Sequence, residues 1–188
     1  MLITNEYNYR THKQNIIDGW SRKEFMAGKL IDVAIISFVV MTVFMLVAMG
    51  FGVYTDPDNL GRIAEQLHYI PMFYLQTFAQ LSIAFLLGYL VKKAFIALGI
   101  FVFYYLVVEN ILVAYLKYKK IPITRFLPIE VSDNILVAPA FTGNFGKDSK
   151  EAYLLSISLV NQQVILTILY TVIIWLICFK VHSKRDLN

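Results

Sequence analysis

The chain of 188 residues has little charge and almost no cysteine. Charged residues make up 16% of it, whereas an ordinary soluble domain has about 25%. Its single cysteine, Cys178, cannot form an intrachain disulfide and so says little about the redox compartment. Residues 1–30 are polar and of mixed charge, without the early apolar core of a secretory signal peptide. Insertion into a membrane is therefore expected to use the first apolar span as an internal signal.

The motifs of several enzyme classes are also missing. Residues 143–148 (GNFGKD) resemble a phosphate-binding loop, but Phe141 stands where that loop needs glycine and Asp148 where it needs Ser or Thr. The three histidines, at positions 12, 68 and 182, have no metal-ligand spacing to Cys178. No Ser/His/Asp arrangement is suggested. The sequence thus predicts a chain that is not an enzyme and that holds no metal or cofactor itself.

What the sequence has in excess is apolar residues, which make up 58% of it and gather in long runs. Four runs approach or exceed the length of about 20 residues that a bilayer-crossing helix needs. They cover residues 33–54, 69–91, 94–116 and 152–179. The spans must be helical, because unpaired backbone groups in lipid are costly. The predicted fold is an all-α, polytopic membrane helix bundle (31–188) preceded by an amphipathic cytoplasmic segment (1–30).

Lys and Arg residues indicate the orientation of the bundle. Four spans put both termini on one side, which carries ten of the 17 basic residues, while the other side carries seven. Lys92 and Lys93, in the tight connection between the second and third spans, count most, because short loops set orientation. Both termini are predicted to be cytoplasmic. Basic residues at span ends also account for the net charge of +4 without nucleic-acid binding.

The segment before the first span is basic and amphipathic. Ile16, Ile17 and Trp20 share one face of a helix, at i, i+1, i+4 spacing. The polar side chains of Lys13, Gln14 and Asp18 lie off that face. Ser21 followed by Glu24 is a capping-box pattern, which predicts that a new helix begins there and continues into the membrane. On these residues alone, a surface helix that binds lipid headgroups is the favoured alternative to a protein-docking helix.

The same segment resembles a known family. The matching positions are Glu6, Arg10-Thr11, residues 14–19, residues 21–25 and Gly28-Lys29. They resemble the first cytoplasmic loop of ABC-2-type ABC-transporter permeases. In that family the loop has a Glu, then Gly/Arg-Thr, and then a short apolar stretch. Ser-Arg, an apolar residue and Lys follow, and they open the next span. Among these permeases, the segment most resembles the bacterial ones that are described with multicopper-enzyme maturation. Residues 127–130 (LPIE) are similar to that group too, less specifically.

The resemblance implies a permease subunit of an ATP-driven exporter in the bacterial cytoplasmic (inner) membrane. A separate cytosolic ABC ATPase, carrying ATP and Mg, would dock on this loop, and a second permease protomer would complete the path. The implied ATPase-coupling residues are Thr11, Gln14, Ile16, Ile17, Asp18, Trp20, Arg22 and Phe25. The family has six spans with the motif loop after the second, whereas this chain begins at the loop. We therefore expect the C-terminal four-span portion of a permease, a start assigned too late, or one piece of a split permease.

Polar residues within the spans are the remaining candidates. Glu109, followed by Asn110, is the one ionisable residue well inside a predicted span, and such residues are often functional. Gln76 and Gln80 lie one turn apart on the second span, and Asn161 opens a polar cluster in the fourth. These five residues either line a translocation path or make interhelical hydrogen bonds, and Glu109 could instead reach the membrane surface.

The rival functions are a small ion-coupled carrier or membrane enzyme using Glu109, and a non-transporting membrane scaffold.

Overall fold

The computed structural model describes residues 21–55, 67–119, 121, 123, 126–136 and 147–184, with the backbone alone at 22, 147–156 and 184. Its elements are α3 (Arg22–Thr55), α5 (Tyr69–Val91), α6 (Ala94–Phe103), η2 (Tyr104–Val108), α7 (Glu109–Tyr118), α8 (Pro128–Asp133) and α9 (Lys147–Lys184). The described part of the chain contains helices and no strand. The predicted all-α fold is therefore confirmed.

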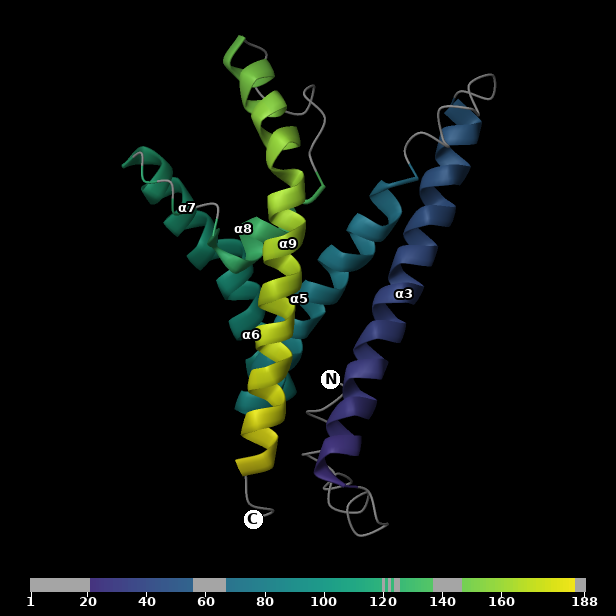
Figure 1. Cartoon of the computed structure of the whole chain (residues 1–188), viewed down its shortest axis with the longest axis vertical. Coiled ribbons are helices and arrows are strands. Elements are labelled where there is room, and N and C mark those ends of the chain that lie inside the picture. Colours follow the sequence, from purple (N-terminus) through teal and green to yellow (C-terminus); the bar gives the residue numbers. More distant parts are fainter. Residues whose placement is uncertain are drawn as a thin grey trace.

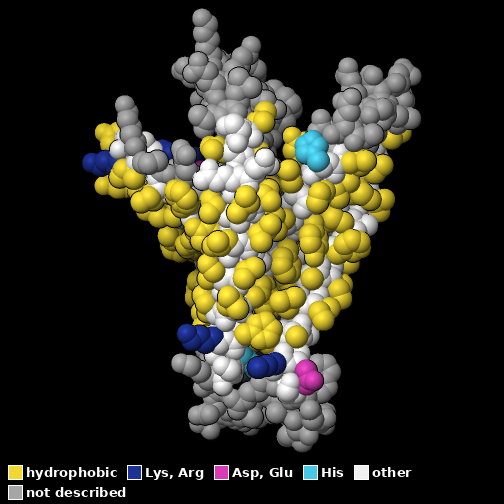
Figure 2. Space-filling model, in the orientation of Figure 1, with side chains coloured by type: hydrophobic (Ala, Val, Ile, Leu, Met, Phe, Trp, Pro, Cys, Tyr) yellow, Lys and Arg dark blue, Asp and Glu magenta, His cyan; other side chains and the backbone are white. Residues whose placement is uncertain are grey.

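Within the described residues, four helices are long and apolar enough to cross a membrane. They cover Lys23–Thr55, Tyr69–Val91, Ala94–Tyr118 and Ile157–Ser183. The third is one continuous rod made of α6, the π-helix η2 and α7. These helices correspond to the four predicted spans, and they make the chain a membrane protein. Figure 2 shows a broad hydrophobic band over the helices, with Lys and Arg side chains near the lower end and at the far left.

Helix α3 begins where the capping box predicted. The Ser21 N–H donates to Glu24 Oε2 at 2.7 Å, and the Glu24 N–H donates to Ser21 Oγ at 3.2 Å. These reciprocal bonds satisfy backbone donors that the first turn leaves free. The helix then runs without a break through residue 30, across the boundary predicted between the amphipathic segment and the bundle.

Most of the predicted ATPase-coupling residues precede α3. Thr11, Gln14, Ile16, Ile17, Asp18 and Trp20 lie outside the described residues. Arg22 is the first residue of α3, and Phe25, one turn on, is buried in the bundle at 2% exposure. Its aromatic ring therefore packs inside this chain.

Helices α5 and α6 form the tight hairpin predicted at Lys92-Lys93. Helix α5 ends at Val91 and α6 begins at Ala94. Lys92 adopts a left-handed conformation with φ 61°, and its N–H donates to the Gly88 carbonyl at 3.0 Å. A left-handed residue followed by an extended one reverses the chain within two residues, as helix-ending motifs do.

Six serine and threonine side chains within the spanning helices bond to their own helix. Each donates to the carbonyl four residues earlier, at 2.6 to 2.9 Å, at Ser37, Thr42, Thr77, Ser82, Thr167 and Thr171. This pattern satisfies a polar group without water or a neighbouring helix. It is the arrangement that a helix surrounded by lipid requires.

The helices converge at one end of the molecule. Figure 1 shows the start of α3 and the end of α9 close together at the lower end, while the upper parts of α3 and α9 diverge. The main hydrophobic core lies at the convergent end. It consists of Phe25, Met26, Val33, Phe85, Tyr89, Trp175 and Cys178, from α3, α5 and α9.

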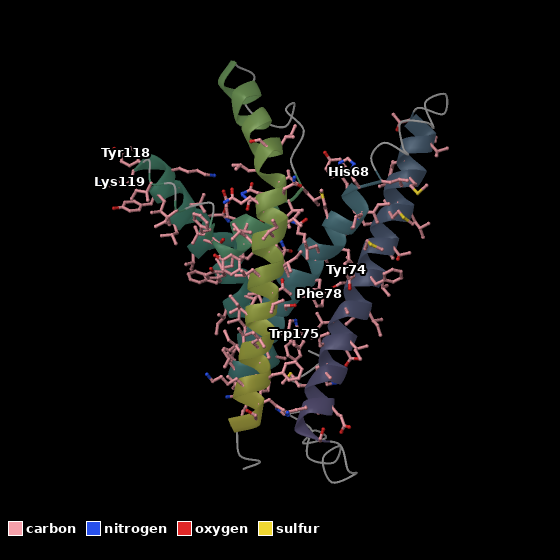
Figure 3. All side chains as sticks on the ribbon, viewed as in Figure 1. His68, Tyr74, Phe78, Tyr118, Lys119 and Trp175 are labelled. Carbon is pink, nitrogen blue, oxygen red and sulfur yellow. The ribbon has the colours of Figure 1, made fainter. Side chains whose placement is uncertain are left out.

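Aromatic and polar contacts tie this end together. The His182 ring stacks on Phe25, with centroids 5.4 Å apart, and its Nδ1 lies 3.0 Å from the Tyr89 hydroxyl. Trp175 stacks on Phe85 at 5.0 Å and donates from Nε1 to Ser82 Oγ at 2.9 Å. In Figure 3, Trp175 points from α9 toward α5. The three helices are therefore locked to one another at this end.

We expect Trp175→Ala to destabilise the bundle by roughly 3 kcal/mol, because it leaves a cavity and removes the bond to Ser82. Thermal unfolding of the purified chain in detergent measures the effect. Leu176→Ala is the control, since this neighbour on α9 is 62% exposed and faces away from the core. Equal melting temperatures for the two variants would contradict the packing described here.

Candidate functional site

The short helix α8 lies inside the bundle although it belongs to the loop between the third and fourth spans. It packs against α5, α7 and α9, and Figure 1 shows it beside the middle part of α9. Just before it, the Phe126 carbonyl accepts a hydrogen bond from the Tyr170 hydroxyl at 2.6 Å. Because Tyr170 belongs to the fourth span, the loop returns to the depth of that span.

Glu109 caps the first turn of α8. Its Oε1 accepts the backbone N–H of Ile129 at 2.8 Å and that of Glu130 at 2.7 Å. Pro128, at the start of α8, has no N–H, so these are the first two donors of the helix. A carboxylate at this position both satisfies the donors and complements the positive end of the helix dipole. Glu109 is 3% exposed, so its carboxylate is enclosed within the bundle.

The π-helix η2 shapes the rod next to Glu109. One extra residue per turn leaves carbonyls without their usual partners, which is why π-segments are short and often lie at functional sites. The exposed Asn110 satisfies two of them, since its Nδ2 donates to the Tyr105 carbonyl at 2.9 Å and to the Leu106 carbonyl at 3.1 Å. The amide of Asn110 is thus engaged with its own helix.

The other end of α8 is held through Asp133. Its Oδ1 accepts hydrogen bonds from Gln80 Nε2 at 2.6 Å and from Gln76 Nε2 at 3.0 Å, both on α5. Its Oδ2 accepts a weaker one from the Tyr105 hydroxyl at 3.4 Å. Burial raises the pKa of the Asp133 carboxyl, and the nearby charge of Glu130 adds to the rise, while the three hydrogen bonds oppose it.

A further contact joins α7 to α8 at the surface. Lys117 Nζ lies 3.0 Å from Glu130 Oε1, and the lysine side chain is largely exposed. Such a pair contributes about 0 to 1 kcal/mol. Figure 3 shows the adjacent Tyr118 and Lys119 at the outer tip of α7, away from the bundle. The buried contacts of Glu109 and Asp133 therefore matter more for holding α8.

Some buried oxygens in the described structure have no hydrogen-bond donor. They include Glu109 Oε2, Gln76 Oε1 and Gln163 Oε1, on α7, α5 and α9. Buried acceptors without donors are uncommon and costly. Within the described residues, no group of three His, Cys, Asp or Glu side chains is arranged to hold a metal ion.

The whole chain, residues 1–188, matches the family described as "Protein of unknown function (DUF2705)". The chain belongs to the DUF2705 family. No curated protein and no solved structure matches it.

The predicted path residues of this DUF2705 protein occupy three different environments. Gln76 and Gln80 meet at Asp133, so they make the interhelical type of hydrogen bond that was one of the two expectations. Glu109 binds the opposite end of α8. Asn110 and Asn161 are exposed, on α7 and α9. A shared translocation path remains a prediction.

Sequence reasoning missed Asp133 and Tyr105. Asp133 lies in the loop between the third and fourth predicted spans, and Tyr105 lies within the third. Pro128 was an available signal, because proline is common in the first turn of a helix. A helix start by itself could not show that the helix folds back between the spans.

We expect Glu109→Leu to release α8, because it leaves two buried N–H groups unsatisfied at a cost of about 1 to 3 kcal/mol each. Glu109→Gln keeps an acceptor oxygen and should retain most of the docking. Limited proteolysis of the purified chain, scored for cleavage between residues 119 and 147, measures the release. Identical cleavage rates for Glu109→Leu and wild type would contradict the capping contact.

Proposed function

We propose that this protein is the membrane subunit of an ATP-driven exporter of the ABC-2 type in the bacterial cytoplasmic membrane. A separate cytosolic ABC ATPase binds ATP and Mg and docks on the amphipathic segment that precedes α3. ATP-driven closure of two ATPases pushes this segment and tilts the spans, which gives alternating access to a path between two permease protomers. The chain itself performs no catalysis in this scheme and needs no cofactor of its own.

The observation that carries this proposal is the way α3 begins. The capping box at Ser21 starts a helix of 34 residues directly after the segment that resembles the family's coupling loop. A continuous helix transmits a push on its first turn along its whole length. Phe25 and Met26, in that first part of α3, are fully packed against α5 and α9. Movement of the coupling segment would therefore reach three spans at once.

The shape of the bundle supports the same function. The spans converge at the end where α3 begins and diverge at the other end (Figure 1). An alternating-access transporter needs a bundle that closes at one side while it opens at the other. The apolar sides of the spans are widely exposed, which leaves room for lipid and for a second protomer.

A carrier that uses Glu109 has less support, because Glu109 Oε1 already binds two backbone N–H groups.

The basic residues favour a cytoplasmic position for the convergent end. Lys92 and Lys93, at the end of α5, adjoin the core that the start of α3 and the end of α9 share. Short basic connections stay on the cytoplasmic side of a membrane. Lys117 and Lys119 lie at the other end of the third span.

This orientation predicts the labelling of single cysteines in a Cys178→Ser background. A Lys147→Cys variant should react with an impermeant thiol reagent added to intact cells, and Ser183→Cys should react only after the cells are opened. The opposite pattern would place the termini outside.

The docking segment predicts the behaviour of Trp20→Ala. A buried aromatic anchor often dominates a helix-in-groove interface, so its loss should cost about 2 kcal/mol or more in association. Co-purification of the chain with a candidate cytosolic ABC ATPase measures this, and ATPase recovery should fall as the affinity falls about 30-fold.

Tyr54→Ala is the matched control, because Tyr54 is an aromatic residue that is 88% exposed at the far end of α3. It should leave ATPase recovery at the wild-type level. Equal recovery with Trp20→Ala and wild type would instead favour a helix that binds lipid headgroups.

A further inference from the structure

Asp133 is a carboxyl group enclosed by neutral donors. The amides of Gln76 and Gln80 and the hydroxyl of Tyr105 point at its two oxygens. Within the described residues, no Lys, Arg or His side chain forms an ion pair with it. A carboxylate buried without a cation is costly, and such a group tends to take up a proton. The arrangement therefore accommodates an anion but does not neutralise it.

The same cluster can also accommodate a protonated Asp133. Gln76 Oε1 is buried and has no hydrogen-bond donor. Rotation of the Gln76 amide by about half a turn exchanges its oxygen and nitrogen, which are nearly equivalent in shape. The oxygen then faces Asp133 and accepts its O–H, while Gln80 and Tyr105 keep their bonds. The site can thus hold the neutral form through an acceptor that the ionised form leaves unused.

Asp133 is surrounded by α5, η2, α7, α8 and α9, and the neighbouring charged groups on α7 and α8 have other partners in the described structure. On α8 itself, Glu130 is paired with Lys117 of α7. On α7, Glu109 is engaged with the first turn of α8. Helix α5 contributes Gln76 and Gln80, η2 contributes Tyr105, and α9 has no charged residue between positions 152 and 179. Tyr170 of α9 binds a backbone carbonyl.

Proton binding and the docking of α8 are thermodynamically linked. Burial raises the pKa of Asp133 while α8 is docked, and release of α8 would return the carboxyl to water. A group whose pKa is higher in the docked state favours docking when it is protonated. Docking is therefore strongest at pH values below the ordinary pKa of Asp. It weakens as the pH rises through the raised value.

We infer that Asp133, with Gln76, Gln80 and Tyr105, is a proton-binding site that controls whether α8 is docked between α5, α7 and α9. The ligand is a proton from solution, which binds an oxygen of the Asp133 carboxylate. Its uptake holds α8 inside the bundle, and its loss releases α8. The inference does not depend on the partner or substrate of the protein.

The test measures how accessible a buried position of α8 becomes as the pH changes. Ser132 is fully buried and the neighbouring Asn134 is exposed. Ser132→Cys and Asn134→Cys are made separately in the full-length Cys178→Ser chain, which is purified in detergent and labelled with a maleimide from about pH 4, near the ordinary pKa of Asp, to about pH 8. The ratio of the two rates cancels the change in thiolate fraction. We expect this ratio to rise at least about threefold with pH, as the linkage requires.

Two further variants identify the responsible group. Asp133→Asn is neutral at every pH and should keep the ratio low and constant. Glu130→Gln is the matched control, since it removes the adjacent carboxylate, and it should keep the pH response with a midpoint at slightly lower pH. A response that persists in Asp133→Asn, or that disappears in Glu130→Gln, would overturn the inference. If Asp133→Asn fails to insert, the chain that keeps Asp133 still tests the inference. In that chain, a ratio of labelling rates that stays flat or falls with rising pH also overturns the inference.

Discussion

The first two backbone N–H groups of α8 have to be satisfied away from bulk water, and Glu109 satisfies both. Much of the central arrangement depends on this contact. Pro128 removes one donor, and Glu109 Oε1 accepts the next two, from Ile129 and Glu130. Without it, a helix of only six residues would carry unpaired donors into the bundle. The contact explains why a carboxylate is tolerated inside an otherwise apolar span, where it is normally costly.

The structure separates a rigid end from a more loosely held centre. At the convergent end, large side chains such as Phe25, Tyr89 and Trp175 interlock three helices. At the centre, α8 is held by hydrogen bonds to Glu109 and Asp133, with an ion pair at the surface. Hydrogen bonds between helices in membranes contribute on average only about 0.6 kcal/mol each. A small change in protonation or in helix tilt can therefore shift α8 while the tightly packed end stays intact.

These two parts suit the proposed exporter and the inferred proton site in different ways. Force applied at the start of α3 acts on the interlocked end, because Phe25 and Met26 belong to its core. The position of α8 responds to conditions at the centre of the bundle, where Asp133 meets Gln76 and Gln80. The third span holds both ends of α8, since Tyr105 of η2 lies beside Asp133 and Glu109 of α7 caps the first turn of α8. Each part can be tested without the other.

The sequence by itself determined the four spans, their helical form, the tight hairpin at Lys92-Lys93 and the start of α3 at the capping box. All of these follow from local physics, namely the length of apolar runs, backbone hydrogen bonding in lipid and the chemistry of helix ends. It also marked Gln76, Gln80 and Glu109 as unusual polar residues but could not find their partners. Only the tertiary structure decided that residues 128–133 fold back among the spans and bring Asp133 to α5 and Ile129 to Glu109. Those contacts join residues 20 to 57 positions apart, and no local pattern encodes which distant donor a buried carboxylate will meet.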